Sequence, residues 1–405
     1  MPNFADPRPR APASVGSRWR WALDHLVKAA RGTWYPTIVF LATRAALLLL
    51  GYLTLGKFAV SPSIRPFPRN LLFDGFFRWD SDWYAHIADQ GYIAPAAIIP
   101  GQQRNTAFFP LYPLCVRVAK VVVGNTWIAG LLVANLAFLA AVIILHRLVR
   151  DRLGEATARR AVVLLCVSPF SIFFAAMYSE SLFLALALGA FYAGDKRRWF
   201  WASVLAALAG ATRVTGCLLL VGLFVLYLEQ SQFRWRSIRA DILYLLLGMS
   251  GPLAFCGFLW ARYGNTFEFY RAQYVSGWAK EAPITAAFAE IVAAMKPTAA
   301  AAGSASSLTF VQIGSIGFVT GAVIWGMFRK KLPLSYAIWS FLMTASVLAK
   351  WTSAGRYLSV VFPVYAAAAA LGEREALYYL IVALSGVLAA HQQILFGSPD
   401  VFVDG

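Results

Sequence analysis

Long apolar runs follow one another along nearly the whole chain after residue 34, and they constrain the fold more than any other feature. About 20 consecutive apolar residues are needed for one α-helix to cross the hydrocarbon core of a bilayer. Hydrophobic residues make up 60% of the 405-residue chain and charged residues only 14%. Because backbone groups inside a bilayer must be hydrogen-bonded within the protein, these runs predict an all-α polytopic membrane protein.

The apolar runs predict about eleven transmembrane helices. A further apolar stretch, 107–123, contains two prolines, an arginine and a lysine, and we predict that it lies at the membrane interface. That assignment places the basic turns between helices on the cytoplasmic side, as the positive-inside rule requires. The spans are expected at 35–55, 127–145, 161–177, 181–194, 200–211, 215–228, 241–260, 308–328, 333–349, 357–371 and 376–396.

The net charge of +17 is explained by this topology. Residues 1–33 form a basic tail that we predict to be cytoplasmic, and 34–398 form one transmembrane domain with outer loops at 56–125 and 262–307. In a soluble protein such a charge would suggest nucleic-acid binding, but here lysines and arginines flank membrane spans. We therefore expect a lipid bilayer as partner and no nucleic acid.

Four motifs rich in polar and aromatic side chains lie in the predicted outer loops and turns. The first is RWDSDWYAHIADQGY (78–92) followed by NTAFFPLYPL (105–114). The others are SPFSIFFAAMYSESLF (168–183), ATRVTG (211–216) and SAGRYLSVVFPVYA (353–366). Ionisable groups gathered in so apolar a chain indicate a functional site near the outer membrane face.

In sequence and order, these motifs resemble those of the PIG-V family, the mannosyltransferases that add the second mannose in GPI-anchor assembly, and their prokaryotic homologues. The resemblance implies a GT-C glycosyltransferase fold with interfacial helices in a large first outer loop. It also implies α-1,6-type transfer of mannose from dolichyl or undecaprenyl phosphate mannose to a glycolipid or other cell-envelope hydroxyl on the non-cytoplasmic face. The membrane would be the inner membrane of a prokaryote or the endoplasmic reticulum of a eukaryote.

Two other functions stay open from the sequence. A transporter or lipid flippase would carry polar residues at the bilayer midplane of several helices, whereas Arg44 is nearly alone at such a depth. An inactive subunit of a mannosyltransferase complex would carry the same motifs without the reaction. A small membrane subunit is a further candidate partner.

Asp80 is the candidate general base, because the resemblance places the aspartate of RWD at the family's catalytic position. A base is needed to deprotonate the acceptor hydroxyl. Asp80 and Ser81 also precede a helical run, so either side chain could instead cap that helix. His86 would point away from the Asp80 face of the helix, and we expect it to be structural.

Arginines in the outer turns are candidates for binding the donor phosphate. We expect Arg356 first, Arg213 second and Arg78 third, since a guanidinium stays charged and can bind phosphate bidentately. Interfacial arginines also reach toward lipid headgroups, which is the alternative for the first two. For Glu180, orienting Arg213, contacting a sugar hydroxyl and forming a plain helix-capping turn all stay open. The further substrate-binding candidates are Tyr357, Glu180, Tyr178, Tyr84 and Asn105.

Asp80 and Asp82 form a DxD sequence, at which Mg²⁺ or Mn²⁺ could bind beside the donor phosphate. Residues two apart in a helix point about 200° apart, so only an extended backbone would bring both carboxylates together. The four cysteines show no metal-ligand spacing. We therefore expect no metal cofactor.

Overall fold

A computed structural model describes residues 15–54, 66–67, 70–99, 102–275, 304–348 and 353–397. Within these ranges every regular element is a helix, which confirms the predicted all-α class. The α-helices are α1 (Val15–Leu53), α2 (Leu71–Asp74), α3 (Asp80–Gln90), α4 (Leu111–Val123), α5 (Thr126–Leu153), α6 (Glu155–Cys166), α7 (Glu180–Asp195), α8 (Trp199–Thr212), α9 (Leu218–Gln230), α10 (Tyr244–Leu247), α11 (Ser250–Tyr263), α12 (Glu268–Val275), α14 (Ser304–Phe328), α15 (Leu334–Leu348), α16 (Ala354–Leu358), α17 (Pro363–Ala370) and α18 (Glu375–Gly397). The 3₁₀ helices are η2 (Pro95–Ala97), η3 (Asn105–Ala107), η4 (Ser171–Phe174), η5 (Val214–Cys217), η6 (Trp235–Ser237), η7 (Ala240–Leu243) and η9 (Leu371–Glu373).

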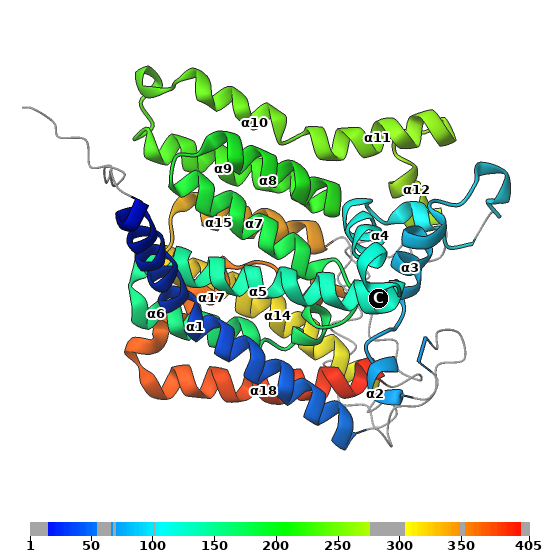
Figure 1. Ribbon diagram of the computed structural model, residues 1–405, viewed down its shortest axis with the longest axis horizontal. Coiled ribbons are helices and arrows are strands. Elements are labelled where there is room, and N and C mark those ends of the chain that lie inside the picture. Colours follow the sequence, from blue (N-terminus) through cyan, green and yellow to red (C-terminus); the bar gives the residue numbers. More distant parts are fainter. Residues whose placement is uncertain are drawn as a thin grey trace, which may run out of the picture.

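The long helices form a bundle that runs along the long axis of the molecule (Figure 1). Helix α5 packs against α1, α6 and α7, and α7 packs in turn against α8. Helices α14, α16 and α17 pack together, and α18 contacts α1. The short helices α2, α3, α4 and α12 gather at one end of the bundle, on the right in Figure 1, and this end carries the first sequence motif.

Several of these helices have the length and composition of membrane spans. Among the described residues five are long and apolar enough to cross a bilayer, namely Gly32–Leu53, Thr126–Leu153, Ala240–Tyr263, Val311–Phe328 and Glu375–Gly397. Shorter apolar helices lie at Trp199–Thr212, Val214–Gln230 and Leu334–Leu348. The chain is therefore an integral membrane protein, while the number of eleven spans and the cytoplasmic N-terminus stay predictions.

Among the expected spans, 241–260 is divided into η7, α10 and α11, and two others are broken near a proline. In 161–177 the helix ends at Cys166, and in 357–371 the chain leaves α16 after Leu358 and begins α17 only at Pro363. Proline disfavours helical geometry in the residue before it and cannot donate a backbone hydrogen bond, so Pro169 and Pro363 explain both breaks. The two breaks lie within the second and fourth motifs, between α6 and α7 and between α16 and α17.

Helix α4 covers much of the stretch expected to lie at the interface. Its side chains Val118, Val121 and Val122 are 70%, 84% and 90% exposed, and their spacing puts them on one face. An exposed apolar face on a helix that also carries Arg117 and Lys120 is typical of a helix lying in the membrane surface. The packing of α4 against α3 and α5 is consistent with the predicted interfacial position.

The predicted domain limits stay untested. Helix α1 already begins at Val15, so the proposed boundary after residue 33 falls inside a helix rather than between a tail and a domain. Of the outer loop 262–307, the structure describes 262–275 and 304–307. Parts of the loop 56–125 also lie outside the described residues.

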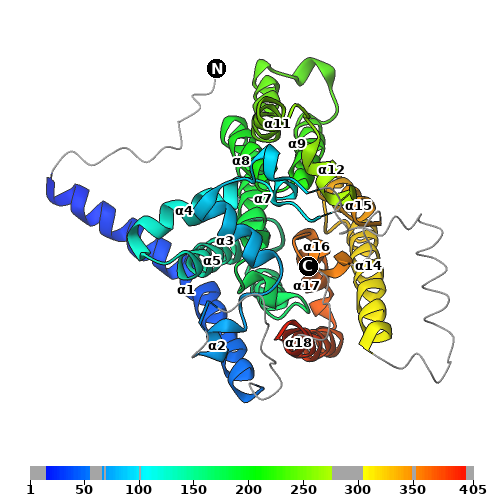
Figure 2. The same cartoon turned by 90° about the vertical axis from the view of Figure 1, so that its right-hand side faces the viewer.

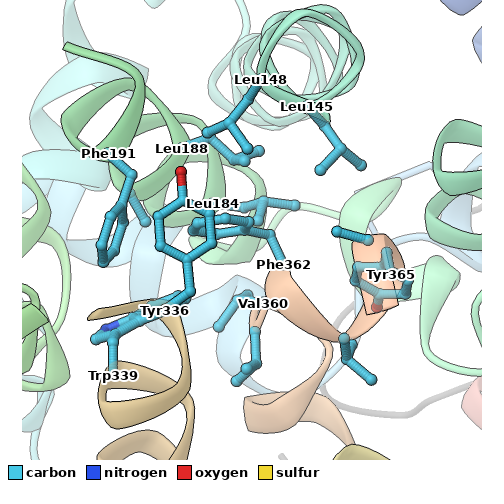
Figure 3. Packing of buried hydrophobic residues seen from close by; sticks show 14 of the residues in the cluster. Leu145, Leu148, Leu184, Leu188, Phe191, Tyr336, Trp339, Val360, Phe362 and Tyr365 are labelled. Carbon is cyan, nitrogen blue, oxygen red and sulfur yellow. The ribbon is translucent and has the colours of Figure 1, made fainter. Parts of the chain in front are cut away.

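A cluster of buried aromatic side chains packs between helices of the bundle (Figure 3). The Phe362 ring lies 5.4 Å from Phe191, 5.3 Å from Tyr336 and 5.2 Å from Trp339, measured between centroids. All four side chains are almost fully buried. Because these rings come from α7, α15 and the segment before α17, they fix the fourth motif against the bundle.

Helices α8 and α11 approach each other closely at Gly251. A Cβ atom at this position would lie 1.8 Å from the carbonyl oxygen of Ala207, which is backbone and cannot move aside. We expect Gly251→Ala to destabilise the protein by about 1 to 3 kcal/mol through overpacking. The measurement is the thermal unfolding midpoint in detergent, with Gly257→Ala in the same helix as control because nothing lies within 4 Å of its added Cβ. Equal midpoints for both variants would contradict this packing.

Candidate active site

Helix α3 begins at Asp80, at the end of the bundle where the short helices gather. The residue before it, Trp79, occupies the cap position with φ of 45° and makes no side-chain cap hydrogen bond. The Ser81 hydroxyl donates to the carbonyl of Met177, 3.3 Å away. The helix-capping alternative for Asp80 and Ser81 is therefore wrong. The Trp79 ring packs edge-on against Phe396 at 5.0 Å, which holds a backbone conformation that a non-glycine residue rarely adopts.

Four charged side chains, one from each of the four motifs, form one buried chain of alternating charge. Arg356 Nη2 donates to Asp80 Oδ2 at 2.7 Å, and Arg356 Nε donates to Glu180 Oε1. Arg213 Nη1 lies 2.7 Å from the same Glu180 oxygen. The Glu180 side chain has no exposed area, and that of Arg356 is 3% exposed. Segments separated by up to 276 residues therefore meet through ion pairs that the low-dielectric surroundings strengthen.

This chain of charges borders a cavity of about 260 Å³. Asp80, Arg213 and Arg356 all contribute to its wall, whereas Glu180 lies behind the two arginines and does not. The cavity therefore offers one carboxylate and two guanidinium groups to a ligand. Its remaining lining residues are Tyr84, Ala107, Phe108, Phe109, Ser179, Thr212, Val214, Thr215, Tyr270, Gln273, Ser346, Val347 and Tyr357.

Aromatic rings fix the two arginines in place. The Arg356 guanidinium carbon lies 4.5 Å from the centroid of the Tyr178 ring, and that of Arg213 lies 4.7 Å from the Tyr357 ring. The Tyr178 hydroxyl donates to the carbonyl of Arg78 at 2.9 Å. Cation–π contacts in a desolvated site add to the ion pairs, so both guanidinium groups are held before any ligand binds.

Tyr84 stands beside Asp80 on the same face of α3, as the helical spacing predicts. Its hydroxyl lies 2.8 Å from the Ser179 hydroxyl. Burial raises the pKa of Tyr84, and the nearby Glu180 and Asp80 carboxylates raise it further. Tyr84 therefore keeps its proton and serves as a neutral hydrogen-bonding group of the cavity wall.

Three candidates from the sequence do not reach the cavity. Arg78 donates to the carbonyls of Asp74 and Phe77 at 2.8 and 2.9 Å, so it stabilises its own turn rather than facing a phosphate. Asn105 is fully buried, and its amide bonds to His86 at 3.2 Å and to the carbonyl of Gly91 at 3.1 Å. Tyr178 is also fully buried and supports Arg356 from behind. These three placements correct the expectation that the side chains contact substrate directly.

His86 is bonded to Asn105, which agrees with the structural role predicted for it. Asp82 is exposed and absent from the cavity wall, while Asp80 is 8% exposed and paired with Arg356. The two carboxylates of the DxD sequence thus have different surroundings, as their separation on a helix predicts. Among the described residues no group of three or more His, Cys, Asp or Glu side chains is placed to hold a metal ion.

Two atoms of the charged chain have no hydrogen-bond partner among the described residues. These are Arg356 Nη1 and Glu180 Oε2, both of them buried. An unpaired buried donor or acceptor costs about 1 to 3 kcal/mol. Arg356 itself lines the cavity, and one of its donors has no partner among the described residues.

A second cavity, apolar and about 440 Å³ in volume, adjoins the first across α16. It lies among α6, α14, α17 and α18, and it opens to the outside of the bundle past Phe318 and Leu384, which are 43% and 56% exposed. Gly355 lines this groove, and the next residue, Arg356, lines the polar cavity. A Cβ at Gly355 would lie 1.9 Å from the Phe170 ring, so glycine is required for this close approach.

Sequence reasoning missed several lining residues. Thr212, Ser346, Tyr270 and Gln273 all contribute to the cavity wall. Thr212 stands beside Arg213 in the third motif and could have been found from that position. The other three lie in stretches without a motif, so nothing in the sequence alone marked them.

The family model described as Mannosyltransferase (PIG-V) matches residues 53–249. The GPI α-1,6-mannosyltransferase 2 of Mus musculus is 30% identical over 158 residues, and that of Homo sapiens is 32% identical over 158 residues. Each match covers 36% of this chain and 30% of the relative. The chain thus matches less than a third of the length of these curated relatives. The recognised similarity includes Asp80, Glu180 and Arg213, while Arg356 lies beyond the residues that the family model matches.

The solved structures that match this chain share little sequence with it. The apo crystal structure of ArnT from Cupriavidus metallidurans has a TM-score of 0.48 and 14% identity, covering 88% of this chain and 62% of that one. The apo oligosaccharyltransferase of Archaeoglobus fulgidus has a TM-score of 0.45 and 12% identity, covering 86% and 56%.

Proposed function

We propose, starting from the match of residues 53–249 to the PIG-V mannosyltransferase family model, that this protein transfers mannose from a polyprenyl phosphate to an acceptor hydroxyl. The observation that carries the proposal is the chain of charges from Asp80 through Arg356 and Glu180 to Arg213 at the wall of one cavity. We further propose a GT-C fold, with this cavity on the non-cytoplasmic side and the N-terminus in the cytoplasm.

The donor phosphate would bind between Arg356 and Arg213. Both guanidinium groups border the cavity, and Arg356 Nη1 has no hydrogen-bond acceptor among the described residues. Positively charged groups that are fixed before the reaction stabilise the negative charge that develops on a leaving phosphate. Glu180 would act as a positioning residue for both arginines, because it pairs with each and lies outside the cavity wall.

The polyprenyl chain of the donor would occupy the apolar groove on the far side of α16. Its wall is almost entirely aliphatic and aromatic, and its exposed rim would face lipid. Since Gly355 lines the groove and Arg356 lines the polar cavity, a lipid phosphate can have its chain in one and its head in the other. Burying several methylene groups contributes about 0.8 kcal/mol for each of them.

Asp80 would accept the proton of the attacking hydroxyl. The acceptor oxygen forms a bond to C1 of mannose while the bond from C1 to the phosphate oxygen breaks, and that electron pair stays on the phosphate. The acceptor proton moves to the Asp80 carboxylate and leaves to solvent after the products separate. Among the described residues the Arg356 bond engages only Oδ2 of Asp80, which leaves Oδ1 for the proton. One displacement on a β-linked donor would give an α-linked product, such as the α-1,6 linkage.

The test uses the purified protein in phosphatidylcholine nanodiscs with radiolabelled dolichyl phosphate mannose or undecaprenyl phosphate mannose. A membrane lipid extract supplies a glycolipid or other cell-envelope acceptor. We expect label to move into a new lipid product. Movement of intact labelled donor between the leaflets of sealed proteoliposomes, without a product, would instead support the flippase alternative. Donor binding with neither result would support an inactive subunit that needs a partner subunit.

We expect EDTA to leave mannosyl transfer unchanged within about twofold. The two arginines provide the positive charge that a metal ion would otherwise supply to the phosphate, and Asp82 does not face the cavity that Asp80 lines. The measurement is product formation after dialysis against EDTA, with readdition of Mg²⁺ and Mn²⁺ in parallel. If EDTA abolished transfer and either ion restored it, the expectation of metal-independent transfer would be overturned. Asp80 and Asp82 would then be candidates for a metal site.

A further inference from the structure

Helix α12 forms the wall of the polar cavity that lies away from the apolar groove. Tyr270 and Gln273 line the cavity, and their three-residue spacing puts them on one face of the helix. Glu268, Phe269 and Ala272 on other faces are 3%, 8% and 0% exposed. The helix therefore has a buried side that fixes it and a polar side that faces the cavity.

A buried ion pair anchors α12 to the first outer loop. Arg104 Nη1 lies 2.7 Å from Glu268 Oε1, and the two side chains are 7% and 4% exposed. The Phe269 ring packs on Phe109 at 5.3 Å, and Phe109 itself lines the cavity. Removing one member of such a pair would leave a buried charge unpaired, so the contact specifies one position for the helix.

The position of α12 separates it from the donor side of the site. In Figure 2, which looks onto this end of the bundle, α16 lies between α12 and α18. The groove proposed for the polyprenyl chain is lined by α18, α17 and α14, whereas α12 contributes only to the polar cavity. A second substrate would therefore reach Asp80 from the α12 side.

We propose that α12 is the acceptor-recognition element of this site, with Gln273 and Tyr270 binding a sugar or polyol headgroup; this inference rests on the proposed function. The Gln273 amide offers both hydrogen-bond donors and an acceptor, which suits neighbouring hydroxyl groups. The Tyr270 ring offers an apolar face to a sugar ring. Arg104 and Glu268 are positioning residues that set the distance of this wall from Asp80. Helix α12 lies beyond residues 53–249, the range that the family model matches.

The test compares Gln273→Ala with Arg271→Ala, since Arg271 is the exposed neighbour on α12 and is absent from the cavity wall. Octyl α-D-mannopyranoside serves as the acceptor probe and labelled dolichyl phosphate mannose as the donor, both in nanodiscs. For Gln273→Ala we expect the KM for the probe to rise at least tenfold, with the KM for the donor and kcat nearly unchanged. Arg271→Ala should behave as wild type. For the anchor, Arg104→Glu should raise the KM for the probe, and Arg104→Glu combined with Glu268→Arg should restore it at least in part.

Probe binding to the wild type, Gln273→Ala and Arg271→Ala is also measured directly, by saturation-transfer NMR without donor. Binding that depends on Gln273 without any mannose transfer would overturn the proposed donor while supporting the acceptor site. Transfer by the wild type with an unchanged KM for the probe in Gln273→Ala would overturn the acceptor site and leave the proposed function standing. If Gln273→Ala lost donor binding as much as it lost probe binding, the acceptor site would also be overturned. If the wild type neither bound the probe nor transferred mannose, both proposals would be contradicted.

Discussion

Replacing Asp80 by asparagine is expected to lower mannosyl transfer by about 10²- to 10⁴-fold, the usual contribution of a general base. Asparagine has nearly the same shape and can still accept the hydrogen bond from Arg356 Nη2, which lies 2.7 Å from Asp80 Oδ2. Arg356 also keeps its pair with Glu180. The variant should therefore fold and bind donor while it cannot take the acceptor proton.

The matched control is Asp82→Asn, which makes the same chemical change two residues away. Asp82 is exposed and does not line the cavity, so its variant should keep nearly full transfer. Initial rates of product formation at saturating donor and acceptor compare the two, and donor binding by each variant is measured separately. Full activity of Asp80→Asn would refute the base assignment, and equal losses in both variants would point to a shared effect on α3.

Replacing Glu180 by glutamine is expected to destabilise the protein by about 3 to 5 kcal/mol, as for the removal of one partner from a buried ion pair. Glu180 has no exposed area and pairs with both Arg213 and Arg356. Its loss leaves two guanidinium groups near each other without a compensating negative charge between them. Their repulsion should also displace them from the proposed phosphate site, so donor binding should weaken together with stability.

Thermal unfolding midpoints in one detergent, followed by circular dichroism, measure this effect. The control is Glu375→Gln in the first turn of α18, where the side chain is exposed and the expected change is below about 1 kcal/mol. A Glu180→Gln variant as stable as this control would show that the arginines find other partners. A stable variant that still binds donor normally would show that Glu180 is not needed to position the two arginines.

The sequence allowed the class of fold and the centre of the site to be predicted, but it could not resolve which polar side chains face inward. Asp80, Arg213 and Arg356 lie in motifs, and the structure gathers all three at one cavity. Arg78 and Asn105 lie in the first motif, yet each donates its hydrogen bonds to nearby backbone carbonyls instead of facing the cavity. A motif marks a side chain as a candidate for the site. Only the folded structure shows whether that side chain faces a ligand or supports its neighbours.

Hydropathy likewise located apolar segments without showing where their helices break. The predicted spans 161–177 and 357–371 were each apolar enough, but each is broken near a proline, at Pro169 and Pro363. Helix α12 escaped prediction for a different reason. Its two cavity-facing residues become recognisable only through the pair between Arg104 and Glu268, which are 164 positions apart.

The chain of Asp80, Arg356, Glu180 and Arg213 contains two negative and two positive charges, so it is electrically neutral before any substrate arrives. In the proposed reaction the proton that moves to Asp80 gives these four residues a net charge of +1. At the same step the leaving phosphate gains one negative charge. The total charge inside the cavity is thus the same before and after bond breaking, and the low-dielectric surroundings need not stabilise any new net charge. Release of the polyprenyl phosphate would then be tied to the return of the Asp80 proton to solvent.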